Sequence, residues 1–410
     1  MDIQRYVLKK YDRDLITFDL YKESLDTYQI NIISKSDNTD DFPNGVYDSS
    51  TLLSWIRRRT IPKNRAFVLE ILESQGIEPN DLIALLNVSK GLSVNDVYWI
   101  VEEGFDGAFD KYNLFENDFS KVLSLIAYTG EYSKNVDSPI SPEWTTSGNL
   151  PKCWRRIDKK LYLYKAGTDK KVLINRSGNE PYSEYYVSKI LDYLNIRHVK
   201  YDLEFFEGRL ASVCECFCSL KYSYVPICDV VKTSNYGELK SVIKQYGFES
   251  DFSDMILIDA LTYNGDRHYN NFGFIKDNET NEFVSLAPLY DHGLCLFSNL
   301  SDYSISDVEL MKNEIKSADI SKWNISHKDL LLDNINDDTV SKLIKMKQYR
   351  IEEHNKYNLN DIRIRVLNMT IQNRVNELLD YITDKDSDDV IQKALDEANR
   401  TIEETNIWLE

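Results

Sequence analysis

The chain has 410 residues, of which 42% are hydrophobic and 28% charged, and 49 Lys and Arg against 67 Asp and Glu give a formal charge of −18. The apolar fraction excludes a disordered protein, and no run of about 18 apolar residues offers a transmembrane helix. The acidic balance argues against indiscriminate nucleic-acid binding, because phosphates are repelled at long range. The first residues, MDIQRYVLKKYDRDL, lack the apolar core of a signal peptide, so we expect a cytoplasmic protein without membrane association.

The first 95 residues are predicted to form an accessory module of strands followed by helices. Strand-like segments with polar turns between them are YVLKKY, LITFDLY and YQINIIS, all within residues 1–47. Helical spacing follows from Leu52 to Gly76, and two further short helices are expected after Asn80 and after Ser93.

A dense basic run lies within this module, at Arg57, Arg58 and Arg59, with Lys63 and Arg65 close behind. Successive residues of a helix point in different directions, so these arginines cannot all face one groove. A solvated or salt-bridged helix is the simpler interpretation, and contact with nucleic acid or an acidic partner is the alternative. No helix-turn-helix pattern supports sequence-specific DNA binding by this chain.

The rest of the chain divides into a β-rich segment at 96–220 and a mainly helical segment at 221–410. The runs LYLYKAG and LASVCECF have strand character, and between them PYSEYYVSKILDYLNI has helical spacing. From about residue 235 onward the patterns are mostly helical. We therefore predict an α+β, bilobal architecture with a β-rich N-lobe, a mainly helical C-lobe and the N-terminal module appended.

The strongest chemical signal lies in residues 261–293, LTYNGDRHYNNFGFIKDNETNEFVSLAPLYDHG. Asp266, Asn271 and Asp291 are expected on loops beside short strands. Phosphoryl transfer needs positioned phosphates, a divalent metal and an oriented hydroxyl, and little covalent help from the protein. Asp266 can orient the hydroxyl, while Asn271 and Asp291 supply the hard oxygen ligands that Mg²⁺ prefers. Turn capping is the simpler interpretation of a single Asp–Asn pair, but three such groups favour the chemical one.

Partners for this chemistry lie upstream. Lys165, on the predicted strand LYLYKAG, can reach nucleotide phosphates, and Glu184, on the next helix, can hold that lysine in an ion pair. The run 145–149, TTSGN, offers backbone N–H groups and small side chains to phosphates, although an ordinary turn is the alternative. The chain has neither a Walker A motif nor a GxGxxG motif.

Four segments in this order, SEYYVSKILDYL, VCECF, GDRHYNN and APLYDHG, resemble HipA-like serine/threonine kinases. The resemblance extends over roughly residues 100–380. Outside this range, the N-terminal module departs from the HipA toxin itself and is more similar to standalone HipA-like proteins of Gram-positive bacteria.

The resemblance implies a role for each matching residue. Asp266 matches the catalytic Asp of a D-x-H-x-x-N motif, and His268 matches a histidine that braces the catalytic loop. Asn271 and Asp291 match the metal ligands. The resemblance and the patterns above together place six residues around the nucleotide: Ser147, Gly148, Lys165, Glu184, Glu215 and Phe217. The last two match the hinge that contacts adenine. In the family, a serine of the phosphate loop can be autophosphorylated. The candidates for this modification in the present chain are Thr145, Thr146 and Ser147.

The leading hypothesis is therefore an ATP- and Mg²⁺-dependent kinase that phosphorylates a serine or threonine hydroxyl of a protein. The resemblance implies partners such as an aminoacyl-tRNA synthetase or another translation factor as substrate, and a small helix-turn-helix antitoxin. Two alternatives stay open. GDRHYNN also resembles the catalytic loop of phosphoinositide kinases, which favours a lipid or small-molecule substrate. A binding module in a toxin–antitoxin or transcriptional complex is the other.

Overall fold

The computed structural model describes residues 3–24, 27–131, 133, 135–168, 177–233 and 235–385. The chain forms two compact units that interleave in sequence. The first consists of residues 1–167, 204–230 and 273–285, and the second of residues 168–203, 231–272 and 286–410.

The first unit begins with a four-stranded antiparallel sheet in the order β3-β2-β1-β4. Its strands are β1 (Ile3–Lys10), β2 (Arg13–Ser24), β3 (Thr27–Lys35) and β4 (Tyr98–Glu102). The expectation of a helix after Ser93 is wrong, because β4 pairs with β1 in that region. The consecutive aromatic and β-branched residues of YWIV are all buried, and a strand covered on both faces accommodates such a run.

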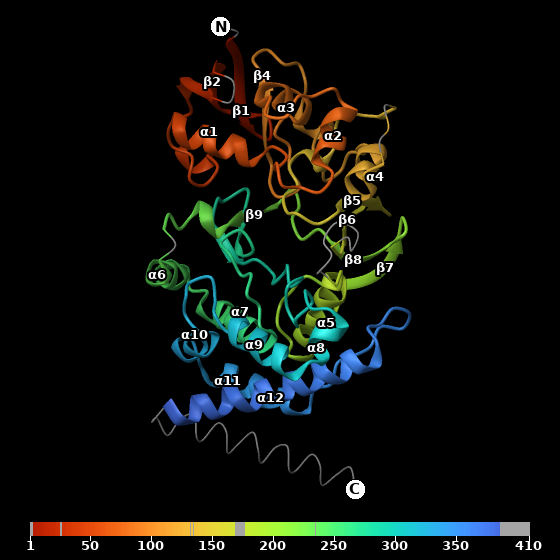
Figure 1. Cartoon of the computed structure of the whole chain (residues 1–410). Coiled ribbons are helices and arrows are strands. Elements are labelled where there is room, and N and C mark those ends of the chain that lie inside the picture. Colours follow the sequence, from red (N-terminus) through yellow and green to blue (C-terminus); the bar gives the residue numbers. More distant parts are fainter. Residues whose placement is uncertain are drawn as a thin grey trace. The chain divides into compact units, whose positions relative to one another are not determined.

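Four helices pack in the same unit, and Figure 1 labels them. They are α1 (Ser49–Arg58), α2 (Val68–Ser74), α3 (Leu82–Ser89) and α4 (Lys121–Thr129). A capping box between Asp48 and Thr51 begins α1, whose Leu52, Trp55 and Ile56 are buried in the core formed with the N-terminal sheet. A second core joins α2 and α4 to the fully buried Trp144. Single 3₁₀ turns of this unit are η1 (Thr39–Asp41), η2 (Phe109–Lys111), η3 (Pro142–Trp144) and η4 (Ile227–Asp229).

A second four-stranded sheet has the order β5-β6-β8-β7. Its strands are β5 (Lys152–Ile157), β6 (Lys160–Ala166), β7 (Tyr201–Phe206) and β8 (Arg209–Glu215). A three-stranded sheet has the order β11-β10-β9, with β9 (Tyr222–Pro226), β10 (Gly273–Asp277) and β11 (Phe283–Leu286). Gly273 begins β10 so close to β9 that a Cβ atom would lie 2.1 Å from the Val225 carbonyl oxygen, which requires glycine there.

The second unit is mainly helical. Its helices are α5 (Glu180–Tyr193), α6 (Tyr236–Tyr246), α7 (Glu249–Thr262), α8 (Asp302–Ser306), α9 (Val308–Ala318), α10 (His327–Asp333), α11 (Asp337–Lys345) and α12 (Asp361–Lys385), with a 3₁₀ turn η5 (Met346–Gln348). The last eight residues of α7, Met255–Thr262, are all buried, and α12, the long blue helix of Figure 1, packs against α7, α8, α10 and α11. Helices buried on every face need apolar residues all round, which explains why α7 reads MILIDAL.

The predicted α+β class, with a β-rich part and a mainly helical part, is confirmed. The predicted division into residues 1–95, 96–220 and 221–410 stays a prediction about domains. In the structure, the N-terminal sheet runs on to Glu102, and the first compact unit takes in segments from all three ranges.

Candidate functional site

The loop that follows α7 carries the predicted catalytic residue, and hydrogen bonds within the loop fix its shape. Tyr263 ends α7 in the left-handed conformation with φ of 56°. The Asp266 backbone N–H donates to Asn264 Oδ1 at 3.1 Å. At the far end of the loop, Asn271 Nδ2 donates to the Asp266 carbonyl oxygen at 3.1 Å. Asp266 and Asn271, five residues apart, are thereby held in contact.

A buried ion pair lies beneath this loop. Arg267 Nε and Nη2 donate to the two carboxylate oxygens of Asp259, at 2.9 and 3.0 Å, and both side chains are only 2% exposed. Burial alone would lower the pKa of the Arg267 guanidinium, but the charge and hydrogen bonds of Asp259 raise it above its usual value. In the structure Arg267 therefore pairs with a carboxylate.

The same guanidinium joins the two loops that hold the predicted metal ligands. Arg267 Nη1 donates to the carbonyl oxygens of Asn271, at 2.9 Å, and Tyr290, at 3.0 Å. Its Nη2 lies 3.1 Å from His292 Nε2. Because Tyr290 and His292 flank Asp291, one buried side chain fixes the backbone at both predicted ligands.

Two tyrosine hydroxyls complete the attachment of the Asp291 loop. The Asp291 N–H donates to the Tyr201 hydroxyl at 3.3 Å, and the Tyr290 hydroxyl donates to the Asn270 carbonyl oxygen at 2.9 Å. Asp291 itself has a φ of 59°, in the left-handed region that costs free energy for a residue with a Cβ atom. Such strain persists where the surroundings over-determine the conformation, and it is common at functional sites.

Helix α5 is tied to this loop at the residue next to Glu184. Ser183 Oγ donates to the carbonyl oxygens of His292, at 2.6 Å, and Cys295, at 2.8 Å. Glu184 is buried on the same turn of the helix. The second unit therefore brings Asp266, Asn271, Asp291 and the turn that bears Glu184 into one connected region.

His268 has local contacts of the kind predicted for a bracing residue. Its Nδ1 accepts the Asn270 N–H at 3.2 Å, and its own backbone N–H donates to the Asp266 carbonyl oxygen at 2.8 Å. These contacts fit a role in shaping the loop, which stays a prediction.

The oxygen atoms of Asn271 and Asp291 fit a magnesium ion. The bond from Asn271 Nδ2 to Asp266 orients the amide, so that Oδ1 is the atom left to act as a ligand. One carboxylate and one amide oxygen are the small protein contribution that Mg²⁺ takes in phosphoryl-transfer sites, where water and phosphate supply the other ligands.

The first unit holds the predicted nucleotide-binding residues other than Glu184. Lys165 lies on β6, where its backbone pairs with Ser212 of β8 and Lys152 of β5. It is half-buried in the middle of the sheet, as the strand pattern of LYLYKAG predicts. Lys165 and Glu184 belong to different units, and their pairing stays a prediction.

The TTSG segment forms a tight loop before β5. Lys152 Nζ donates to the Ser147 carbonyl oxygen at 2.8 Å. Gly148 has a φ of 98°, and a Cβ atom there would lie 2.2 Å from Lys152 Nζ. The positive φ therefore favours glycine here, and any larger residue would also displace the end of the Lys152 side chain.

Arg65, from the connection between α1 and α2, holds this loop from behind. The guanidinium is fully buried and donates to the Glu143, Thr146 and Lys152 carbonyl oxygens at 2.9, 2.8 and 3.2 Å, besides its ion pair with the Glu143 carboxylate. Burial raises the pKa of Glu143, an effect that the charge of Arg65 opposes. Sequence reasoning treated Arg65 as part of a solvated or salt-bridged basic run and did not connect it with this loop.

The predicted hinge residues follow the end of β8. Glu215 is the last residue of the strand, and its exposed side chain pairs with Lys160 at 2.9 Å. The next N–H, that of Cys216, donates to the Leu161 carbonyl oxygen at 2.8 Å. Phe217 packs edge-on against Tyr224 with ring centroids 5.7 Å apart. The contact of either residue with adenine stays a prediction.

Ion pairs within the first unit account for most of the basic run near residue 57. Arg58 pairs with Asp229 at 2.8 Å, and Arg59 makes a bidentate contact with Asp96 while it stacks over Trp55. The salt-bridged interpretation is confirmed for these two arginines and for Arg65.

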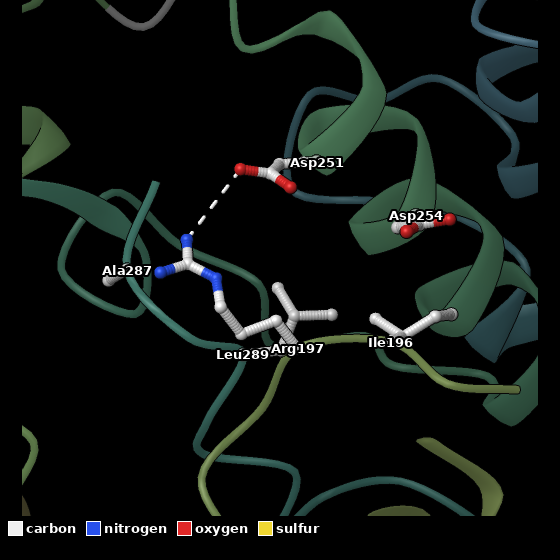
Figure 2. A pocket seen from close by; sticks show the side chains of 6 residues that line it. All are labelled: Ile196, Arg197, Asp251, Asp254, Ala287 and Leu289. Carbon is white, nitrogen blue, oxygen red and sulfur yellow. Dashed lines mark ion pairs between the residues drawn. The ribbon is translucent and has the colours of Figure 1, made fainter. Parts of the chain in front are cut away.

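A shallow pocket in the second unit is unrelated to the predicted site. Figure 2 shows it between Ile196, Arg197, Asp251, Asp254, Ala287 and Leu289. Arg197 reaches across it to Asp251 at 3.6 Å. Its volume of about 10 Å³ has room for a single water molecule at most. Among the described helices, none is long and apolar enough to cross a membrane.

Comparison with solved structures defines the fold. One chain of a toxin–antitoxin complex of HipA, HipB and operator DNA from Shewanella oneidensis aligns with this protein. The alignment covers 92% of this chain and 98% of the matched chain, with a TM-score of 0.53 and 12% identity. The chain therefore has the fold of HipA, as the sequence motifs predict. No family model matches it.

A curated relative is the serine/threonine-protein kinase CtkA of Helicobacter pylori, which is 25% identical over 140 residues. The match covers 30% of this chain and 43% of the relative. The crystal structure of CtkA aligns with 60% of this chain and 94% of its own, at 19% identity and a TM-score of 0.47.

Proposed function

We propose that this protein is an ATP- and Mg²⁺-dependent kinase that transfers the γ-phosphate of ATP to a serine or threonine hydroxyl of a protein. The observation that carries the proposal is the buried Arg267, which fixes Asn271 and the Asp291 loop in one site beside Asp266. A catalytic carboxylate next to two metal ligands is the minimal machinery of phosphoryl transfer.

Each residue has a part in this reaction. Asp266 orients the acceptor hydroxyl and takes its proton, while Asn271 Oδ1 and the Asp291 carboxylate hold Mg²⁺. The ion neutralises charge on the phosphates when it is bound. Lys165 contacts the nucleotide phosphates, and the buried Glu184 supplies the negative charge that keeps the lysine in place. Ser147 and Gly148 approach the phosphates with their backbone, and the segment of Glu215 and Phe217 receives the adenine.

The test compares the purified wild type with Asp266→Ala, with radiolabelled ATP and a mixture of bacterial proteins as acceptors. The wild type should label itself or a protein band, whereas Asp266→Ala should lose roughly 10³-fold or more in rate, as enzymes do without a catalytic group. The control Asp337→Ala removes an exposed carboxylate at the start of α11 and should label normally. Equal labelling by wild type and Asp266→Ala would contradict the assignment, and labelling of lipid vesicles alone would favour a phosphoinositide-type substrate.

We propose Ser147 as the autophosphorylated residue of the TTSG loop, and the contacts of the other two hydroxyls support this choice. Thr145 Oγ1 donates to the Leu92 carbonyl oxygen at 2.9 Å. Thr146 Oγ1 donates to the Pro142 carbonyl oxygen at 2.7 Å and accepts from Trp154 Nε1 at 2.9 Å. Ser147 is exposed. Mass spectrometry of the active enzyme should find phosphate on Ser147, and Ser147→Ala should remove it while Thr145→Ser keeps it.

We further propose a small helix-turn-helix protein as a partner, because the matched structure contains HipB and operator DNA. An aminoacyl-tRNA synthetase or another translation factor is the proposed substrate class. Phosphoproteomics of cells that express the wild type or Asp266→Ala would identify the acceptor.

A further inference from the structure

A kinase site needs positive charge where the phosphoryl group is transferred, and the catalytic loop does not supply it from its own arginine. Arg267, the residue after Asp266, is buried and turned toward Asp259. Its remaining donors are directed to backbone carbonyl oxygens and to His292. The cation adjacent in sequence to Asp266 is therefore structural.

A lysine far away in sequence reaches Asp266 instead. Lys322 Nζ lies 3.2 Å from Asp266 Oδ1, and the side chains are 50% and 36% exposed. An ion pair this open to water contributes at most about 1 kcal/mol to stability, so the contact has little structural value. Both groups are accessible to a ligand that enters from solvent.

Lys322 projects from a tight, hydrogen-bonded turn between α9 and α10. Ser321 donates to the Ile325 carbonyl oxygen twice, from its N–H at 3.0 Å and from its Oγ at 2.8 Å. Ile320 and Ser326 form an antiparallel bridge, and Asn324 takes a left-handed φ of 56° that reverses the chain. The turn is a built element with a defined direction.

Aromatic packing fastens this turn to the catalytic loop. The Trp323 ring contacts Tyr236, Tyr269 and Phe272 at centroid distances of 5.5, 6.3 and 6.4 Å. Trp323 Nε1 also donates to the Tyr269 hydroxyl at 3.3 Å. Tyr269 and Phe272 lie within the loop that runs from Asp266 to the start of β10, so the position of Lys322 is set relative to Asp266.

The base of the turn is anchored to the core of the second unit. The buried Arg374 of α12 forms an ion pair with Asp319, where the turn begins, and donates from Nε to the Ala260 carbonyl oxygen of α7 at 2.9 Å. Helix α7 leads directly into the catalytic loop. The turn and the loop thus share one support, which limits the movement of Lys322.

We propose that Lys322 is a catalytic residue that contacts the transferring γ-phosphoryl group, an inference that rests on the proposed function. In this step the bond between the γ-phosphorus and the β,γ-bridging oxygen breaks and a bond to the acceptor oxygen forms. The acceptor proton passes to Asp266, and ADP leaves. Lys322 exchanges no proton; it stabilises the charge on the phosphoryl oxygens, a contribution that is greatest where charge develops.

The test compares Lys322→Met and Lys322→Arg with the wild type. Lys322→Met should lower kcat by roughly 100-fold, the effect of the loss of one transition-state donor, and Lys322→Arg should recover part of it. The control Lys316→Met removes an exposed lysine from the neighbouring α9 and should keep wild-type kcat. Thermal unfolding should be equal for all four proteins, because Lys322 is half-exposed.

A binding measurement separates this inference from the proposed function. The probes are a non-hydrolysable ATP analogue and ADP. Lys322→Met should weaken binding of the analogue by about fivefold, which corresponds to the strength of a half-exposed ion pair, and leave the affinity for ADP unchanged. If the wild type transfers phosphate and Lys322→Met turns over within threefold of it, or faster, the inference is wrong. If the wild type shows no transfer, the proposed function fails. The binding measurement then still tests Lys322: if the ratio of analogue affinity to ADP affinity is the same in the wild type and in Lys322→Met, the role of Lys322 is overturned as well.

Discussion

Substitution of Asp259 by asparagine should destabilise the protein severely, although the two side chains have nearly the same shape. The Asp259 carboxylate accepts three hydrogen bonds, from Arg267 Nε and Nη2 and from Asn264 Nδ2 at 2.7 Å. Asparagine can accept only through its single oxygen, and it leaves the Arg267 charge buried without a counter-charge. Loss of one partner from a buried ion pair costs about 3–5 kcal/mol, a large fraction of the usual 5–15 kcal/mol of a domain.

The assay is urea denaturation of Asp259→Asn, beside Asp19→Asn as the matched control. Asp19 also makes a two-point contact with an arginine, Arg5, but that arginine is 44% exposed. The control should lose at most about 1 kcal/mol. A loss of less than 1 kcal/mol in Asp259→Asn would refute the reasoning.

A double variant separates the stability of the pair from its function. In Asp259→Leu/Arg267→Met both charges are replaced by apolar groups, so much of the lost stability should return, with strongly non-additive effects. Phosphate transfer should not return, because after Arg267→Met the side chain has no donors for the carbonyl oxygens of Asn271 and Tyr290. Recovery of activity together with stability would show that Arg267 does not position the metal-binding loops.

Two further outcomes test other parts of the first unit. Gly148→Ala should weaken nucleotide binding and cost up to about 1 kcal/mol more stability than Gly104→Ala, because both positions have positive φ but a Cβ atom at 148 displaces Lys152 Nζ from the Ser147 carbonyl oxygen; equal costs in thermal unfolding would rule out this displacement. Burial, together with the charge of Lys10, lowers the pKa of Lys276 to about 8, so between pH 8 and 10 the unfolded chain binds more protons and the folded state gains stability as the pH rises. The stability of the wild type relative to Lys276→Met, measured by urea denaturation, should increase by about 2 kcal/mol over that range, and a difference that does not change with pH would contradict the buried charge.

Local patterns predicted most of the fold. The three N-terminal strands, the strand of Lys165 and the helix of Glu184 lie where alternation and helical spacing placed them. The segment at 98–102 was missed because a run of buried apolar residues has no period that distinguishes a strand from a helix. Its strand form depends on pairing with β1, a contact between residues about 90 positions apart that no local pattern contains.

The site was predicted only as far as its motifs extend. Spacing within GDRHYNN and APLYDHG singled out Asp266, Asn271 and Asp291, but it gave no reason for Arg267 to turn inward. The available signal was Asp259, a lone acid in the apolar run MILIDAL, since a buried carboxylate requires a partner. Lys322 and Arg65 had no comparable signal, because each reaches the site from a segment that is distant in sequence.

The contact of Arg65 with the loop before β5 bears on how the chain can be shortened. Its guanidinium supplies hydrogen bonds to three carbonyl oxygens of the segment 143–152, and Trp144 of the same segment is buried among residues of α2 and α4. Deletion of the first 95 residues, which would trim the protein to the part that resembles a kinase, would strip this loop of its inner support. The segment around Arg65 therefore belongs to the same folded unit as the proposed nucleotide-binding loop, and a minimal fragment must retain it.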